Sequence, residues 1–482
     1  MKFAGCCAVN GESFNQSFSI GFHRPRSNLE PPTSSRGTLQ PVSLEPEPLN
    51  PTLPETLSDA RVRRTMNLSI FEGMPSMFFI NLTQGSVLTG FALFCGANPF
   101  ELGLLSSVPL FGQVLSPMIA WWAGRLGRRK FLSFWLAFIG RGLWILAAML
   151  PAIAPKESRA GLLILIVALS SILMAGNGTL WTAWMGDVVP AQERGRYFGL
   201  RGGILGVVGT LASLLAGFYI DATPSPQDFQ VVIGVAILVG LIAASLLLAH
   251  DEPKIYTVRL RFQETFTVPF QNANFRQFMV FAVYWTFSVL VAAPFVFPYF
   301  IKYLGMTYTQ IAIWTTISSV SGLLFSPWWG RLADRAGNKP VLQLATAMCA
   351  LLLPGSWMLA QPGIIFPIWI AAIFDAMVWG AIGPAQFNLA LSSAPQTNRS
   401  SFIAVMSAVT GLAGFVGGLI SGVLFGWFAA LPSGEALGFH WTNYHWLFLC
   451  SALLRSQAWR FLQPMKEPGA WRVRDMISRL WA

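Results

Sequence analysis

Long apolar runs separated by short polar connections are the dominant pattern of this 482-residue sequence. A window of about 19 residues, the length at which a helix crosses the hydrocarbon core, divides these runs into two sets of six. The first set lies at about 75–95, 101–123, 131–152, 161–184, 198–220 and 230–250, and the second at about 277–301, 309–329, 340–360, 364–391, 402–429 and 442–462. The runs are continuously apolar rather than alternating, which favours helices over barrel strands. The sequence therefore predicts an all-α integral membrane protein with twelve transmembrane helices.

The polar segments outside these runs set the predicted domain boundaries. They give an N-terminal tail at 1–60, a first six-helix bundle at 65–250, a linker at 251–276, a second six-helix bundle at 277–462 and a C-terminal tail at 463–482. Eight prolines lie between Pro25 and Pro54, among Ser, Thr and Glu, with almost no aromatic residues. Such a segment cannot bury enough apolar surface to fold, so we expect the N-terminal tail to be disordered and cytoplasmic.

Charge is scarce and unevenly placed. Only 11% of residues are charged and the net charge is +11, whereas soluble domains carry about 25% charged residues. The short loops on the side of the N-terminus hold fifteen Lys or Arg, and the opposite loops hold only Lys156, Arg159 and Lys302. Positive loops face the cytoplasm, so both termini are predicted to be cytoplasmic, and the positive charge indicates contact with the lipid bilayer rather than with nucleic acid.

The two halves of the sequence repeat each other. A shift of 210 positions aligns Gly112, Ser116, Pro117, Ala123, Arg125 and Gly127 with Gly322, Ser326, Pro327, Ala333, Arg335 and Gly337. Small residues four positions apart also recur, as Gly414, Gly418 and Gly422 in the eleventh predicted helix and Gly209, Ser213 and Gly217 in the fifth. This spacing lets membrane helices approach closely. The pattern predicts two parallel halves of six helices each.

One repeated loop carries a family resemblance. The segment from Gly330 through Asp334, Arg335 and Gly337 to Lys339 resembles the signature loop of the major facilitator superfamily, and Lys339 aligns with Arg129 of the first half. The first-half copy keeps the basic end but has Ala120 and Gly124 where the family has Gly and Asp. That copy ends with Arg125, Gly127, Arg128 and Arg129, and the Asp187 to Arg194 loop after the fourth helix is also similar to the family. The resemblance covers about residues 65–465 and implies two six-helix bundles whose cytoplasmic loops latch one side closed. The alternative is that these loops only anchor the topology.

Three ionisable residues lie deep in predicted spans: Arg141, Asp375 and Arg455. Such groups are costly in a membrane and are therefore candidates for function. The resemblance implies that helices 1, 4, 7 and 10 line the central cavity, which makes Asp375 the candidate for ion coupling or substrate pairing. The alternative for Asp375 is a carboxylate hydrogen-bonded between helices, and Arg141 and Arg455 fall on helices expected at the periphery.

Uncharged polar and aromatic residues gather on the same four helices. The candidates for lining a cavity are Asn81, Gln84, Asn177, Trp181, Tyr284, Trp285, Trp379, Gln386 and Asn388. Such groups suit a small polar or amphiphilic ligand. Trp181 could equally belong to an interfacial aromatic belt.

The sequence contains no metal-binding or nucleotide-binding motif and no clustered catalytic residues, so we expect neither an enzyme nor a cofactor. The leading hypothesis is a monomeric secondary transporter in the plasma membrane that moves a small molecule by alternating access, coupled to protons. The alternative is a non-transporting sensor or assembly factor on the same scaffold.

Overall fold

The structure is a computed structural model that describes residues 58–126, 129–190, 193–222, 225–253, 262–394, 399–431, 434–436 and 439–480. Residues 53–482 form one compact unit, and the description below concerns this unit. Apart from residues 58–60, the predicted N-terminal tail lies outside the described residues. The linker is described up to Pro253 and again from Phe262.

The first half of the unit contains six membrane-length helical segments, three of which are interrupted. Its elements are α1 (Asp59–Thr83), α2 (Gly85–Phe94), α3 (Pro99–Val114), α4 (Ser116–Leu126), α5 (Arg129–Gly142), α6 (Trp144–Ile153), the 3-10 turn η1 (Lys156–Ser158), α7 (Arg159–Val188), α8 (Arg194–Ala222), α9 (Pro226–Leu246) and the 3-10 turn η2 (Leu247–Ala249). The break between α1 and α2 falls at Gln84, whose backbone is extended, and at Gly85, whose φ of 60° suits glycine. Helix starts are capped locally, as where Asn98 and Glu101 form a capping box at α3.

The second half repeats this order. Its elements are α10 (Phe262–Gln271), α11 (Ala273–Leu290), η3 (Ala293–Phe295), α12 (Val296–Pro298), the π-helical turn η4 (Tyr299–Tyr303), α13 (Tyr308–Ala336), α14 (Asn338–Leu359), α15 (Phe366–Ser393), α16 (Arg399–Phe428), β1 (Gly434–Ala436), β2 (Phe439–Trp441), α17 (Asn443–Leu462) and α18 (Val473–Leu480). The two strands form an antiparallel hairpin in which Glu435 is opposite His440. Three elements lie where the sequence predicted only linker or tail: α10, the start of α11 and α18.

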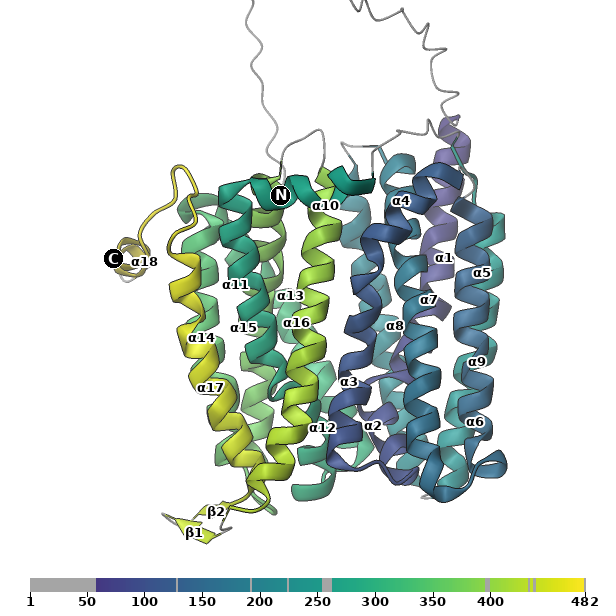
Figure 1. Cartoon of the computed structure of the whole chain (residues 1–482), viewed down its shortest axis with the longest axis vertical. Coiled ribbons are helices and arrows are strands. Elements are labelled where there is room, and N and C mark those ends of the chain that lie inside the picture. Colours follow the sequence, from purple (N-terminus) through teal and green to yellow (C-terminus); the bar gives the residue numbers. More distant parts are fainter. Residues whose placement is uncertain are drawn as a thin grey trace, which may run out of the picture. The chain divides into compact units, whose positions relative to one another are not determined.

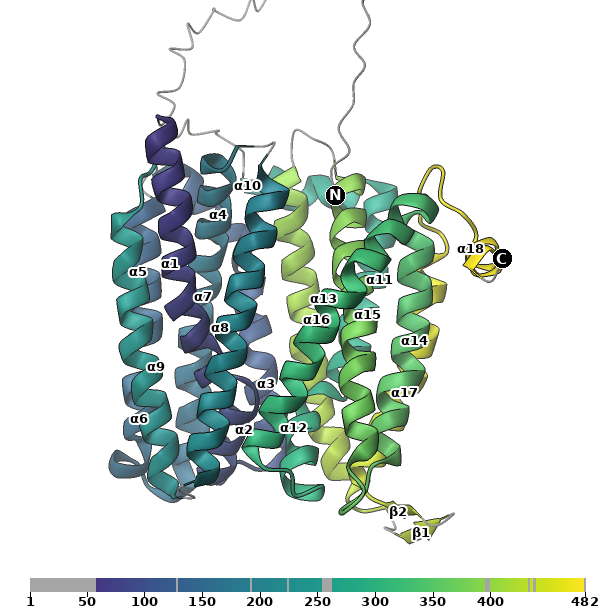
Figure 2. The ribbon, with the colours of Figure 1, turned by 180° about the vertical axis from the view of Figure 1, so that it is seen from behind.

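Each predicted apolar run coincides with one of these helical segments. Ten segments of the described chain are long and apolar enough to cross a membrane, and α13 and α17 stand beside them in the second half (Figure 2). Figure 1 shows α1 to α9, in purple to teal, as one group and α11 to α17, in green to yellow, as the other. The fold is therefore all-α and spans the membrane many times, as predicted.

The most extensive contacts between the halves join α3 with α16 and α8 with α13. The close approach of α3 and α16 requires glycine, because a Cβ on Gly103 would lie 2.6 Å from the carbonyl oxygen of Gly418. A Cβ on Gly217 of α8 would likewise lie 2.8 Å from the Tyr308 carbonyl oxygen of α13. The predicted close approach along the small-residue faces is confirmed at these positions.

We name the two ends of the unit by their elements. The hairpin end carries β1 and β2, and the α10 end carries α10 and the start of α1 (Figure 1). At the hairpin end, Asp221 of α8 accepts hydrogen bonds from the backbone amides of Tyr308 and Thr309, at 3.0 and 2.6 Å. These amides belong to the first turn of α13, so a carboxylate of one half caps a helix of the other.

Candidate functional site

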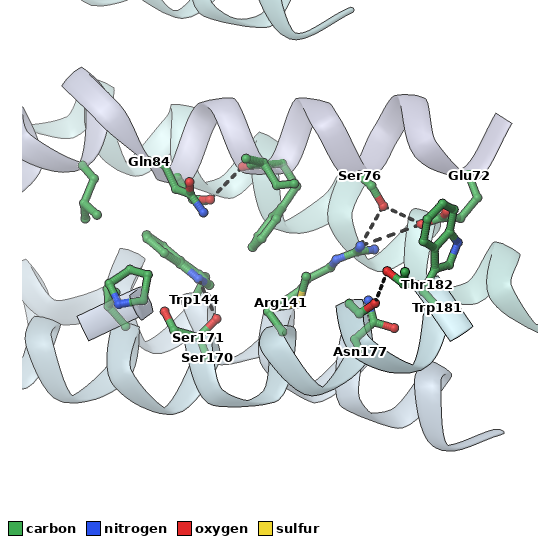
Figure 3. Close-up of a pocket in the computed structure, with 18 of the residues that line it drawn as sticks. Glu72, Ser76, Gln84, Arg141, Trp144, Ser170, Ser171, Asn177, Trp181 and Thr182 are labelled. Atoms are coloured by element: carbon green, nitrogen blue, oxygen red, sulfur yellow. Dashed lines mark hydrogen bonds and ion pairs between the residues drawn. The ribbon is translucent and has the colours of Figure 1, made fainter. Parts of the chain in front are cut away.

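A cavity of about 320 Å³ lies inside the first half (Figure 3). Helices α1, α2, α3, α5, α6, α7 and α8 all contribute to its wall. The wall combines polar residues, Ser76, Ser170, Ser171, Asn177 and Thr182, with apolar residues, Phe79, Trp144, Val167 and Met174. A pocket of this size with few polar groups in an apolar wall is typical of small-molecule sites.

Glu72 and Arg141 bring opposite charges to this cavity from α1 and α5. Both residues are buried, with exposed fractions of 3% and 2%. Arg141 donates to Ser76 Oγ at 2.7 Å and to the Gly240 carbonyl oxygen at 2.8 Å, while its Nη2 lies 3.9 Å from Glu72 Oε1. Ser76 in turn donates to Glu72 Oε1 at 2.6 Å. The serine hydroxyl therefore sits between the carboxylate and the guanidinium (Figure 3).

Arg201 of α8 adds a second cation at the same carboxylate. Its Nη2 lies 3.9 Å from Glu72 Oε2, and its guanidinium lies 4.2 Å from the centre of the Trp181 ring. Stacking on an aromatic face holds a guanidinium flat without using up its N–H donors. Two guanidinium groups thus face one carboxylate.

The sequence analysis missed this cluster. The predicted first helix began near residue 75, whereas α1 begins at Asp59, so Glu72 was placed outside the membrane helix. Arg201 was counted among the Lys and Arg of the short loops, although it lies near the start of the predicted fifth run and inside α8, which begins at Arg194. The signal was present in the spacing of Glu72, Ser76, Phe79 and Thr83, which recur on one face of a helix.

The candidate residues of the first half are partly brought together. Gln84, Asn177 and Trp181 line the cavity, as does Arg141, which had been expected at the periphery. Asn81 instead bridges α1 and α8: its amide donates to the Met77 carbonyl oxygen, and its Oδ1 accepts from Ser213.

The candidates of the second half are dispersed. Tyr284 donates to the Leu454 carbonyl oxygen and stacks on Phe461, with ring centres 4.2 Å apart. Trp285 is buried, 6.1 Å from the Trp379 ring. Gln386 lines a smaller cavity of about 280 Å³ between α11, α15 and α16. Asn388 donates to Asn338 near the α10 end.

Asp375 of α15 accepts a hydrogen bond from Ser318 of α13 at 2.7 Å. It lines neither of the two cavities above. The neighbouring Arg455 is buried and donates to the Val289 carbonyl oxygen at 3.3 Å. No ion pair within 4.0 Å joins Asp375 and Arg455 among the described side chains. Asp375 is therefore a carboxylate hydrogen-bonded between two helices, as the alternative to a role in coupling predicted.

The predicted loop motifs lie at the α10 end. Arg129 pairs with Asp187 at 2.6 Å, and Arg194 donates to the Gly186 and Val189 carbonyl oxygens. Gly337 has a φ of 97° and follows the exposed Asp334 and Arg335 in the last turn of α13. Gly330 lies on the same helix. Gly127 and Arg128 lie outside the described residues, and of Arg125 only the backbone is described.

His250 is the buried ionisable group just beyond the last span of the first half. Its ring lies 5.5 Å from the Trp184 ring, and Nδ1 lies 3.0 Å from the Leu246 carbonyl oxygen. Burial lowers the pKa of His250 below its ordinary value, and the Leu246 carbonyl opposes this effect.

Two membrane-embedded helical halves, the first of which encloses a buried polar cavity, are typical of membrane solute transporters. The family model for the Major Facilitator Superfamily matches residues 73–418 and 277–476. The chain belongs to this superfamily, which places it among multi-pass membrane transporters of small molecules rather than among enzymes.

Known proteins resemble parts of the chain or its fold. A 147-residue segment is 29% identical to the multi-drug resistance efflux pump PmrA of Streptococcus pneumoniae and covers 30% of this chain and 34% of the pump. A 137-residue segment is 30% identical to the proton-coupled folate transporter of Rattus norvegicus and covers 28% of this chain and 29% of that one. The chain thus matches about a third of the length of these relatives.

Solved structures match over a greater length. A D-xylose–proton symporter has a TM-score of 0.64 at 17% identity, covering 84% of this chain and 98% of its own. A bacterial homologue of the iron transporter ferroportin, in an inward-facing state, has a TM-score of 0.62 at 14% identity over the same shares. At these identities the likeness shows the fold alone.

Proposed function

We propose that the protein is a secondary active transporter that moves a small solute across the plasma membrane by alternating access, coupled to protons. The observation that carries this proposal is the cavity with charged residues inside the first half. In addition, the two halves contact each other along helix faces lined with glycine. Smooth contacts let one half rock against the other around a fixed site. We propose the monomer as the functional unit because one chain contains both halves.

The α10 end is proposed to face the cytoplasm. Most Lys and Arg of the short loops lie at this end, and positive loops stay on the cytoplasmic side. Both termini would then be cytoplasmic. The hairpin end, where Asp221 holds α13, would be the outer gate.

The relatives support transport but differ in cargo. One is named a multi-drug efflux pump and the other a proton-coupled folate transporter. Only the class of protein is carried over, because the two names specify different substrates. A carboxylate inside the membrane can carry a coupled proton, and we propose Glu72 and Asp375 for this role.

Paired spin labels test alternating access. One pair, Arg196→Cys with Arg331→Cys, spans the two halves at the α10 end, and the other, Gln227→Cys with Lys302→Cys, spans them at the hairpin end. All four positions are exposed, and the five native cysteines are first replaced. We expect two distances for each pair, with the short distance at one end accompanying the long distance at the other.

The competing function makes a different prediction. A sensor or assembly factor that does not transport would give one fixed distance at each end, or would bind a ligand without exchanging it across proteoliposomes. Either result would overturn the transporter proposal.

A further inference from the structure

The cavity of the first half has more positive than negative charge. Among the described residues that line it, Glu72 is the only carboxylate, and it faces both Arg141 and Arg201. Each guanidinium lies 3.9 Å from the carboxylate, beyond hydrogen-bonding distance. An unbalanced charge in a membrane interior is costly unless an ion of opposite sign accompanies it.

The guanidinium groups also have donors to spare. Arg141 is 2% exposed, and its Nε has no hydrogen-bond partner among the described residues. Arg201 donates through Nε to the Ser69 carbonyl oxygen at a long 3.3 Å and is otherwise held by the Trp181 ring. A buried guanidinium with unused N–H groups is suited to binding an oxyanion in a bidentate manner.

We propose that this cavity binds a small organic monoanion, a carboxylate or sulfonate, whose oxygens lie between Arg141 and Arg201. The inference rests on the proposed function, because it names the substrate class of the same site. Glu72 compensates one of the two positive guanidinium groups, and the bound oxyanion compensates the other.

The rest of the wall limits the body of the ligand. Trp144, Val167 and Met174 give the cavity an apolar region, while Ser170, Ser171 and Asn177 supply hydroxyl and amide groups. A volume of about 320 Å³ lies at the lower end of ligand pockets, which favours a ligand the size of one substituted ring. A cation is disfavoured because it would meet two positive groups and one negative group.

Binding to the purified full-length protein in lipid nanodiscs tests the charge requirement. The probes are benzoate and benzenesulfonate, and their neutral counterparts are benzamide and benzenesulfonamide. We expect calorimetry to detect the two anions and to show binding of the amides weaker by about tenfold or more, because an uncharged ligand leaves the second guanidinium uncompensated.

Three variants separate binding from folding. Arg201→Gln should weaken anion binding by about tenfold or more. Glu72→Gln should strengthen it, since the internal competitor for the guanidinium groups is removed, and a merely structural role of Glu72 predicts no such gain. Lys156→Gln is the matched control, because it removes one exposed positive charge at the hairpin end and should leave binding unchanged.

The results that overturn the inference are definite. Equal binding of an anion and its amide would do so, as would absence of binding of both anions, or weaker binding by the Glu72→Gln variant in folded protein. Counterflow of labelled benzenesulfonate, which stays charged and does not cross lipid unaided, distinguishes the two proposals. Anion binding without counterflow would refute transport and leave the anion site standing.

Discussion

Asp221 offers the most direct test of the gate at the hairpin end. Its carboxylate accepts two backbone N–H groups from the first turn of α13, at 3.0 and 2.6 Å. The contact joins the two halves, so it exists only while they are closed together at this end. Asp221→Ala removes both acceptors without adding bulk.

The size of the effect follows from this geometry. Hydrogen bonds to charged groups contribute about 1.5–3 kcal/mol each, and an anion at a helix N-terminus adds about 0.3–1 kcal/mol. Asp221 is half-buried, so solvent screening reduces the summed energy of these interactions. We take about 2 kcal/mol for the two hydrogen bonds together. That energy changes the ratio of closed to open states by about 30-fold.

The spin-label pair Gln227→Cys with Lys302→Cys measures this ratio. We expect Asp221→Ala to increase the long-distance population at the hairpin end and Asp221→Asn to have a smaller effect, because the amide oxygen still accepts. Glu157→Ala removes an exposed carboxylate from the same end and should change nothing. If Asp221→Ala leaves the distances of a folded protein unaltered, the carboxylate does not stabilise the closed gate.

Three further changes test other parts of the molecule. Asp375→Asn should abolish accumulation of benzenesulfonate driven by a pH gradient while sparing counterflow. The control Ser318→Ala, which removes only the hydrogen bond to Asp375, should retain part of the accumulation. Intact accumulation in Asp375→Asn would exclude Asp375 as the proton carrier. Gly418→Leu should cost about 1–3 kcal/mol of stability and favour separation of α16 from α3, because a Cβ added at this position would clash with the Cβ of Ser107. Thermal unfolding measures the loss of stability and the spin labels measure the separation. Burial lowers the pKa of His250 in the folded protein. The stability contributed by the neutral ring is therefore fully present above the unfolded pKa of about 6.5 and decreases as the pH falls below that pKa. A His250→Gln variant should show a flatter dependence of the melting temperature on pH.

The positions of the long apolar helical segments could be predicted from sequence because a membrane span needs a long apolar run, whatever its neighbours are. Asp375 was recognised for the same reason, as a lone carboxylate in such a run. Glu72 escaped because α1 extends well beyond its apolar part and begins in a polar segment that includes Arg61, Arg63 and Arg64. Hydropathy marks where a helix crosses lipid, not where the helix begins.

The site itself depends on side-chain directions that hydropathy does not contain. Arg141 was expected at the periphery, yet its side chain reaches Ser76 of α1 and lines the cavity. Asn81 was expected in the cavity, yet it turns toward Ser213 of α8. A rotation of roughly 100° separates neighbouring residues of a helix, so assigning residues to a helix cannot by itself assign them to a site.

The repeat between the halves extends to a contact that the alignment of the two halves by a fixed shift did not reveal. Glu252 follows the last helix of the first half and accepts from the backbone amide of Arg129, at 2.6 Å. Glu467 follows the last helix of the second half and accepts from the amide of Lys339, at 2.7 Å. Proline follows each glutamate in the sequence.

Each glutamate therefore caps the first turn of the third helix of its own half, where the amides are free and the helix dipole favours an anion. The basic residue of the signature loop supplies the amide in both cases. Both contacts lie within one half, so they persist when the halves separate and keep each half rigid at the α10 end. By contrast, the contacts of Asp221 and Gly418 cross between the halves, and the proposed rocking motion would break them. Rigid halves joined by separable contacts are what a rocking motion requires.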